Sequence, residues 1–362
     1  MKIGILTYHR AENYGALLQA YAMKTFLLSL GHDVSFIDYW PKYHSDYFRL
    51  FSWNRFWSKG VKGKFILLRN YMMPSKHLRK YRLQRFIHKK LGVDEIPVYS
   101  DSNSVTNHYD VVVYGSDQIW RKQNLGSIGF DDWYFGSDNV QTNKRIAYAG
   151  SMGIIDCTET DDEYLKTMML NYNSISVRES DLQAYLKRIG IDSIQVLDPV
   201  FLLSKEQWLS IIAPSVSRGD YILFYNLLNS AEAKMFARRL GKEKGMPVVE
   251  ITKRNLMGKG YVRSASVERF LQLINDAAYV VSNSFHGVAF SIIFEKQFYA
   301  VGMGKKSSRV VSLLSSIELK ERYSDDGSGI TDSEIDYGKI GERLSLLKNQ
   351  SVSFLLDSLN NA

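Results

Sequence analysis

The sequence predicts an α/β protein with two Rossmann-like, doubly wound domains. The first observation is a βαβ unit at the start of the chain, with an apolar strand at 2–8, an amphipathic helix at 16–30 and a second strand at 34–39. The right-handed crossover of such a unit places its strands in one open parallel sheet. The second observation is that apolar strands followed by polar loops recur as far as residue 301. The third is the length, because 362 residues suffice for two ordinary domains.

Polar loops gather at one edge of the first domain, which we place at residues 1–203. Its further strands are expected at 109–114, 145–149, 174–177 and 194–197, with a helix at 180–188. The carboxyl ends of parallel strands meet at one edge of the sheet, where ligands bind. The loops at that edge contain Asn13, Tyr14, Ser116, Asp117 and Arg178. A dinucleotide-binding Gly-x-Gly-x-x-Gly is absent from the first loop.

Residues 40–91 interrupt the alternation and are expected to form a helical insertion that is first aromatic and then basic. The stretch 76–90 carries seven Lys or Arg residues and no acid, with Leu78, Tyr81, Phe86 and Ile87 on its less polar side. One interpretation is an insertion helix with solvated bases and a packed apolar stripe. The other is a docking surface, either for an anionic or lipid-linked acceptor or for peripheral contact with a membrane.

A second Rossmann-like domain is expected at residues 204–330. Its strands are predicted at 221–225, 248–251, 279–281 and 298–301, and its helices at 231–244, 267–276 and 287–295. The segment 331–362 is expected to be helical and to pack back on the first domain. Two such domains face to face would enclose a cleft that helix amino termini enter from both sides.

The stretch 279–296 is where we expect the chemistry. An apolar strand passes through Ser282-Asn283-Ser284 into an apolar helix, with His286 and Gly287 at the turn. The free N–H groups and dipole of such a helix end favour a phosphate or carboxylate. Gly287 allows a close approach of the backbone. His286 is then either an acid or base beside the ligand, or a residue that caps the helix and fills the interface.

Composition excludes several classes of site. No apolar run approaches the length of about 18 residues that a membrane span needs, and no signal peptide is expected at the start. Cys157 is the single cysteine, so neither an internal disulfide nor a Cys-based metal site is expected, which favours the cytoplasm. We expect no metal and no Gly-x-Ser-x-Gly hydrolase. The net charge of +8 suits an anionic partner.

The remaining polar residues suggest chemistry on a phosphorylated, anionic small molecule. The candidate set is Asn13, Ser116, Asp117, Arg178, Ser284, His286 and Arg309. Each has a structural alternative, since Asn13 and Asp117 can cap helices, Arg178 can form a surface ion pair and Arg309 can be solvated. Arginines and helix ends would hold the anion, and His286 would serve as acid or base.

The chain resembles the polysaccharide pyruvyl transferase family. Seven blocks that follow one another between about residues 3 and 322 carry this resemblance. They are Asn13-Tyr14-Gly15-Ala16 with Leu18–Ala22, Gly115–Trp120, Ala147–Ser151, Ser176–Glu179, Leu197–Pro199, Ser284–Gly287 and Ser308–Val310. One block would be weak, but seven in the right order are specific.

The resemblance implies a GT-B-like arrangement of the two domains and phosphoenolpyruvate as a co-substrate, with no bound cofactor. The acceptor would be a sugar of a bacterial surface glycan, free or lipid-linked, and nucleic acid is not an expected partner. The family's histidine matches His286. Arg178, Ser284, Gly287 and Arg309 are then expected at the donor, and Asn13, Tyr14, Ser116 and Asp117 at the acceptor or cleft. The enzyme would act in the cytoplasm or at the inner face of the membrane.

One departure from the family pattern concerns the donor. Some members carry Arg-Leu-His where this chain has Ser284-Phe285-His286, so Arg178, Arg309 or Arg263 would have to hold the anion. Two other functions stay open. The fold also suits a GT-B glycosyltransferase that uses a nucleotide sugar, and a non-enzymatic protein could bind glycan or membrane through residues 40–90.

Overall fold

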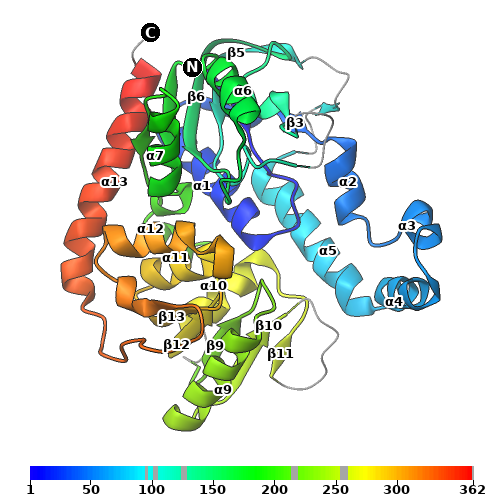
Figure 1. Ribbon diagram of the computed structural model, residues 1–362, viewed down its shortest axis with the longest axis vertical. Helices are drawn as coiled ribbons and strands as arrows, with labels where there is room; N and C mark the ends of the chain where they lie inside the picture. Colours follow the sequence, from blue (N-terminus) through cyan, green and yellow to red (C-terminus); the bar gives the residue numbers. More distant parts are fainter. Residues whose placement is uncertain (94–96, 101–104, 124–128, 213–218, 253–259, 361–362) are drawn as a thin grey trace.

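Two six-stranded parallel sheets, one above the other in Figure 1, organise the molecule. The computed structural model describes residues 1–93, 97–100, 105–123, 129–212, 219–252 and 260–360. Helices flank each sheet, so the chain has the two Rossmann-like domains in a GT-B-like arrangement that the sequence predicted. A hydrophobic core continues from the first sheet into the second, so the two halves share buried side chains at their junction.

The first sheet has the order β2-β1-β5-β6-β7-β8. Its strands are β1 (Lys2–Leu6), β2 (Asp33–Phe36), β5 (Val105–Tyr114), β6 (Val140–Gly150), β7 (Ser174–Val177) and β8 (Ile194–Gln195). The order reverses between β1 and β5, which is where ligands of doubly wound sheets bind. The strand predicted at 34–39 is divided, because β3 (Asp38–Tyr39) leaves to pair with β4 (Val98–Tyr99). There the buried Asp38 carboxylate accepts a 2.9 Å hydrogen bond from His9 Nε2 and pairs with the Arg10 guanidinium.

The second sheet has the order β11-β10-β9-β12-β13-β14 and reverses between β9 and β12. Its strands are β9 (Ile222–Tyr225), β10 (Val248–Ile251), β11 (Tyr261–Val262), β12 (Tyr279–Ser282), β13 (Gln297–Val301) and β14 (Tyr323–Ser324). The four longer strands were predicted within one or two residues. The short edge strands β11 and β14 were not, because two residues are too few to show a pattern.

The connecting helices cover both sheets. They are α1 (Tyr14–Ser29), α6 (Glu159–Met169), α7 (Ser180–Arg188), α8 (Lys205–Leu209), α9 (Ala231–Lys244), α10 (Val267–Asp276), α11 (Phe285–Ile293) and α12 (Ser308–Ser316). Short 3-10 turns lie at Asp132–Phe135, Pro199–Phe201, Gly304–Lys306 and Lys320–Arg322. Helix α11 begins two residues earlier than predicted, which places His286 inside its first turn. No helix of the described residues is long and apolar enough to cross a membrane.

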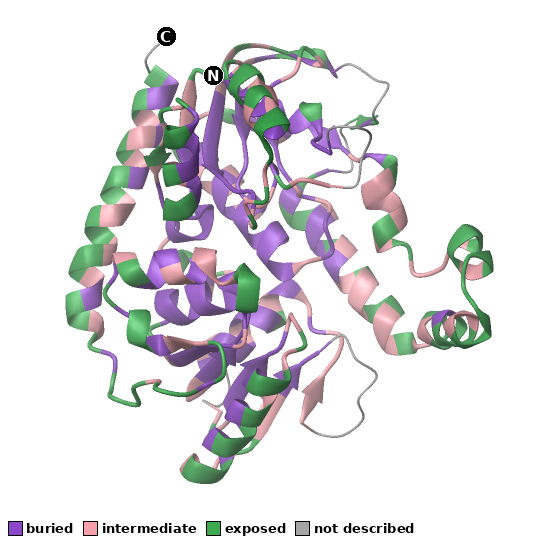
Figure 2. Cartoon of the chain, in the orientation of Figure 1, coloured by how far each residue is buried: buried purple, intermediate pink, exposed green. Residues whose placement is uncertain are grey.

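The predicted insertion is helical and projects from the side of the first half (Figures 1 and 2). It contains α2 (Lys42–Phe48), α3 (Trp53–Trp57), α4 (Val61–Tyr71), α5 (Pro74–Phe86) and a π-helical turn (Ile87–Leu91). Phe86 and Ile87 are buried as expected, whereas Leu78 and Tyr81 are exposed. The buried side of α5 instead includes Leu83, which packs in the core with Phe86.

Several bases of α5 contact the protein instead of solvent alone. Arg82 Nη1 donates a 2.6 Å hydrogen bond to the carbonyl of Ser264, in the second half of the chain. Arg79 Nη2 donates to the carbonyl of Glu12 at 3.1 Å, and Lys80 pairs with the Glu12 carboxylate. Helix α5 therefore helps to join the two halves.

Tyr14 is the central side chain of the junction. Its hydroxyl donates a 2.8 Å hydrogen bond to the carbonyl of Ala265, and its ring stacks on Phe270 with centroids 4.5 Å apart. At the other side of the molecule, α13 (Tyr337–Asn360) runs along both halves (Figure 1). Near its start Tyr337 donates to the carbonyl of Lys296, and farther along the hydroxyl of Ser351 accepts from Leu197 N–H.

Replacement of Tyr14 by Phe tests the junction. The ring can keep its stacking on Phe270, but the buried carbonyl of Ala265 loses its donor. We expect Tyr14→Phe to lower the free energy of unfolding by about 1–3 kcal/mol in urea denaturation. Tyr47→Phe, at a side chain that is 75% exposed, should change it little. Equal stability of the two variants would show that the hydroxyl contributes nothing.

Candidate active site

A cleft of about 590 Å³ lies where the switch points of the two sheets face each other. The loops after β1 and β5 provide one wall, and the segments after β9, β12 and β13 provide the opposite wall. The first wall includes Tyr8, Asn13, Asp117, Gln118 and Arg121, with Tyr43, His44, Tyr47 and Phe48 added by α2. The second includes Leu227, Leu228, Asn283, Ser284, Phe285, His286, Lys306 and Arg309. Residues far apart in the sequence thus form one site, as the recurring polar loops predicted.

His286 lies where the amino termini of α1 and α11 meet. Gly15, in the first turn of α1, packs so closely on the imidazole that a Cβ atom there would overlap the ring. Asn13 caps the same turn by accepting a 3.0 Å hydrogen bond from Gly15 N–H. His286 is 7% exposed, and its Nε2 has no hydrogen-bond partner among the described residues. Because two positive helix ends converge on this point, it favours an anion.

Asp198 holds the negative charge next to His286. Its Oδ2 lies 3.6 Å from His286 Nε2, and the same oxygen accepts a 2.5 Å hydrogen bond from Arg178 Nη1. Burial alone would raise the pKa of the Asp198 carboxyl, but the charges of His286 and Arg178 hold that pKa well below its ordinary value. Asp198 therefore stays ionised at neutral pH.

Arg178 and Arg309 lie near the same two groups. The Phe285 ring lies 4.7 Å from the Arg178 guanidinium carbon and 6.0 Å from that of Arg309. Glu179 Oε1 lies 3.4 Å from Arg178 Nε and 4.0 Å from Arg309 Nε. Burial raises the pKa of the Glu179 carboxyl, against the opposing effect of both arginines. Arg309 reaches the cleft, whereas Arg178 lies behind Phe285 with its side chain 1% exposed.

The cleft lining is basic. Its described residues include Arg121, Lys306 and Arg309 but only one acid, Asp117. Arg309 Nε has no hydrogen-bond partner among the described residues although it is buried. Buried donors without partners are rare in folded proteins, so this arginine is available for an acceptor atom of a ligand.

An aromatic wall covers the side of the cleft opposite the second half. Tyr43 and Tyr47 come from α2, and Tyr8 follows β1. The Tyr43 hydroxyl donates a 2.6 Å hydrogen bond to Asp131, and burial together with that carboxylate raises the pKa of Tyr43. The ring therefore stays neutral and fixed in place. Aromatic faces beside hydroxyl and amide groups suit a polar ring such as a sugar.

The structure distributes the predicted residues over three places. Asn13, Asp117, Ser284, His286 and Arg309 line the cleft. Ser116 and Arg178 lie behind it on Asp198, with Ser116 Oγ 3.3 Å from the same Oδ2 that Arg178 binds. Gly287 packs so closely on Ser282 and Tyr225 that a Cβ atom at this position would clash with them. Arg263, the third arginine considered, is not among the residues that line the cleft.

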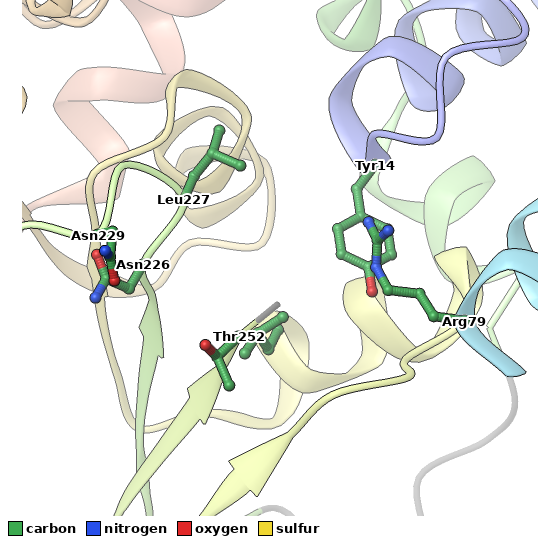
Figure 3. A pocket seen from close by; sticks show the side chains of 7 residues that line it. Tyr14, Arg79, Asn226, Leu227, Asn229 and Thr252 are labelled. Carbon is green, nitrogen blue, oxygen red and sulfur yellow. The ribbon is translucent and has the colours of Figure 1, made fainter. Parts of the chain in front are cut away.

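Tyr14 belongs to a second, smaller cavity. This cavity, of about 200 Å³, lies between the two halves and is also lined by Arg79, Asn226, Leu227, Asn229, Ile251 and Thr252. Figure 3 shows Tyr14 and Arg79 on one side and the asparagines with Thr252 on the other. The guanidinium of Arg79 lies 5.3 Å from the Tyr14 ring. Tyr14 therefore joins the halves at the back of the main cleft.

Sequence reasoning did not select Asp198, Arg121, Lys306 or the aromatic wall as site residues. A signal existed for Asp198, which follows the strand at 194–197 as Ser116 and Asp117 follow another. No comparable signal exists for the residues of α2, because nothing in the sequence fixes where an insertion packs. Among the described residues no group of three or more His, Cys, Asp or Glu could hold a metal ion.

A family model described as polysaccharide pyruvyl transferase matches residues 13–304. No curated protein matches the chain. Similar solved structures include UDP-GlcNAc 2-epimerase from Neisseria meningitidis, with 8% identity and a TM-score of 0.47 over 99% of each chain. UDP-GlcNAc 2-epimerase from Methanocaldococcus jannaschii has 9% identity and a TM-score of 0.43, covering 96% of this chain and 93% of that one. E. coli heptosyltransferase WaaC has 10% identity and a TM-score of 0.37, covering 83% and 88%.

A methyl group at position 15 should disturb the site. In Gly15→Ala the new Cβ overlaps the His286 ring, so either the ring or the first turn of α1 must shift. We expect a loss of about 1–3 kcal/mol in the free energy of unfolding, measured in urea. The matched control is Gly341→Ala in α13, where a Cβ meets open space and the change should be neutral or stabilising. Full stability of Gly15→Ala would contradict the contact.

Loss of the Asp198 charge should destabilise the protein in a pH-dependent way. Asp198→Asn removes the closest carboxylate of the buried Arg178 and leaves it only the more distant Glu179 and Asp117, so we expect a loss on the order of 3 kcal/mol at pH 7. Because the pKa of Asp198 is lower in the folded protein than its ordinary value of 3.8, its stabilisation is complete above that value. It is lost as the pH falls toward the folded pKa. The difference in unfolding free energy between wild type and Asp198→Asn should therefore be constant above about pH 5 and narrow as the pH falls below about 4 in urea unfolding.

The control for that experiment is Asp220→Asn, at an exposed carboxylate. Its free energy of unfolding should equal that of the wild type at every pH. A gap for Asp198→Asn that stayed constant down to pH 3 would show that the Asp198 charge does not contribute the stability.

Proposed function

The chain belongs to the polysaccharide pyruvyl transferase family, and from this we propose that it moves the enolpyruvyl group of phosphoenolpyruvate onto a sugar of a bacterial surface polysaccharide or its precursor. The product would be a pyruvate ketal that bridges two hydroxyls, with phosphate released. The observation that carries the proposal is His286, placed between two helix amino termini in a basic cleft and beside the ionised Asp198. Phosphoenolpyruvate is a small anion with both a phosphate and a carboxylate.

The donor would bind on the second wall of the cleft. Arg309 and Lys306 supply positive charge there, and the first turn of α11 supplies N–H groups at Phe285 to Gly287 that no side chain caps. Arg121 faces them from the first wall. In our proposal Arg309 takes the place of the arginine that some family members carry at the position of Ser284. Arg178 contributes from behind, by holding Asp198 and Phe285 in position.

The reaction that we propose begins with a proton transfer from the His286 imidazolium to C3 of phosphoenolpyruvate. C2 then becomes oxocarbenium-like, and a sugar hydroxyl forms a C–O bond to it as the hydroxyl loses its proton. The bond from C2 to the phosphate oxygen breaks and phosphate leaves. A second hydroxyl then bonds to C2, loses its proton and closes the ketal. Asp198 Oδ2, 3.6 Å from His286 Nε2, would hold the imidazole in position for this transfer.

The acceptor sugar would lie against the aromatic wall. Tyr8, Tyr43 and Tyr47 offer ring faces, and Gln118 and Gln123 offer amide groups to hydroxyls. This wall stands across the cleft from His286, Lys306 and Arg309, so acceptor and donor would meet between the two halves. Asn13 and Asp117 lie at the same edge and would contact either substrate. We place the reaction in the cytoplasm, where phosphoenolpyruvate is available, or at the inner face of the membrane.

Loss of the His286 imidazole tests the proton transfer. We expect His286→Ala to lower kcat about 10²–10⁴-fold, because a positioned general acid contributes about that factor. The measurement is acceptor-dependent phosphate release from phosphoenolpyruvate with a panel of nucleotide-linked and lipid-linked sugars. His108→Ala, at an exposed histidine of β5, is the control and should keep full activity. Full activity of His286→Ala would show that the histidine does not transfer the proton.

The same assay on the wild-type protein distinguishes the pyruvyl transferase from the nucleotide-sugar glycosyltransferase. No acceptor-dependent phosphate release across the panel would argue against the pyruvyl transferase. Thermal stabilisation by a nucleoside diphosphate but not by phosphoenolpyruvate would instead favour the nucleotide-sugar glycosyltransferase.

A further inference from the structure

The end of the insertion exposes large apolar side chains. We define the helical tip as residues 53–72, which contain α3 and α4. Trp53 and Trp57 are 63% and 67% exposed, and their rings lie 6.5 Å apart on the surface. Figure 2 shows the tip standing away from the rest of the molecule. Exposed aromatic side chains gathered in this way indicate an interaction surface.

Helix α4 carries an apolar stripe on its exposed face. Val61, Phe65, Leu68 and Met72 recur at helical spacing and are 87%, 67%, 44% and 71% exposed. Leu67 points the other way and is buried. Leu67 is the only buried side chain of the helix, and most of its large apolar residues face outward. This is the reverse of an ordinary amphipathic helix on a globular domain.

The same segment concentrates the positive charge of the chain. The tip contains Arg55, Lys59, Lys62, Lys64 and Arg69 and no acid. Residues 49–93 contain thirteen Lys or Arg and no Asp or Glu. The rest of the chain therefore has 33 basic and 38 acidic residues, a net charge of −5 against the total of +8. The partner of the tip should be both anionic and apolar.

We propose that the helical tip docks on an anionic lipid bilayer. Tryptophan, tyrosine and phenylalanine partition to the interface between headgroups and acyl chains, and lysines and arginines bind anionic headgroups. Lys64 already lies 4.6 Å from the Trp57 ring, so base and aromatic ring can enter the interface together. A symmetric contact between two copies is less favourable, because it would bring ten uncompensated positive charges together.

This assignment moves the membrane contact away from residues 76–90. In that stretch Arg79, Lys80 and Arg82 bind protein groups, and its buried apolar residues pack in the core. Helix α5 instead connects the tip to the cleft. Lys80 Nζ donates a 3.1 Å hydrogen bond to the carbonyl of Phe48, which lines the cleft. Docking of the tip would hold the aromatic wall near the bilayer, which, on the proposed function, suits an acceptor sugar linked to a lipid.

Vesicle binding tests the proposal without any catalysis. The purified full chain is floated with vesicles of phosphatidylcholine alone or with 30% phosphatidylglycerol, and tryptophan emission is recorded. We expect binding to the anionic vesicles, a blue shift of the emission, and weaker binding at high salt. In the double variant Phe65→Ser and Leu68→Ser the partition coefficient should fall about tenfold or more. Lys62→Gln with Arg69→Gln should also lower it.

Matched controls separate docking from general effects. Leu170→Ser and Lys187→Gln change an exposed apolar residue and an exposed base elsewhere, and both should bind as the wild type does. Unchanged thermal unfolding of each variant shows that the fold is intact. Activity on a water-soluble acceptor should also persist in the tip variants, so a failure of docking is distinguishable from a failure of the proposed function.

Three outcomes would overturn the proposal. The wild type fails to bind anionic vesicles, the tip variants bind them as well as the wild type does, or light scattering shows a dimer that the Phe65→Ser and Leu68→Ser variant loses. The last outcome would assign the tip to contact between copies of the chain.

Discussion

The first turn of α1 lies directly against the imidazole of His286, and only a residue without a side chain fits at position 15. This contact brings together the amino termini of two helices that belong to different sheets. Their dipoles and the N–H groups of their first turns add positive potential at one point. The position of the cleft and the packing of the two halves both require this approach. Tyr14, the neighbour of Gly15, holds it in place through Ala265 and Phe270.

Buried charge is the second constraint on the site. Asp198, Arg178 and Glu179 are each at most 4% exposed, and such groups generally cost folding free energy unless each has a partner. Here the carboxylates and guanidinium groups neutralise one another, while Arg178 Nη2, Arg309 Nε and His286 Nε2 keep no hydrogen-bond partner among the described residues. These are donors or potential donors gathered around one wall. An anion in the cleft could accept from Arg309 Nε and His286 Nε2, which line it, whereas Arg178 lies behind Phe285.

Sequence periodicity was sufficient for the long elements and for the two-sheet architecture, because buried parallel strands are continuous apolar runs and the helices between them are amphipathic. It also placed Asn13 and Asp117 in loops at the edge of the first sheet and His286 at the turn after a strand of the second. The divided strand at Asp38 could not be foreseen, because His9 and Arg10 reach that carboxylate only in the folded chain. The prediction that Leu78 and Tyr81 lie on the packed side of α5 was wrong for a similar reason. Which face of an insertion is buried depends on the surface that receives it, and that surface is built by distant residues.

Helix α13 has a mechanical consequence for the molecule. Its start is bound to the second half through Tyr337, and its later turns are bound to the first half through Ser351 and Phe354, which packs near Tyr148. A wide hinge-like opening of the halves would have to bend this 24-residue helix or detach one of its ends. On that side the helix therefore limits the separation of the two halves. Substrates and products would therefore exchange through the side of the cleft that faces α2, by movements of loops and side chains, while the two sheets keep their relative orientation.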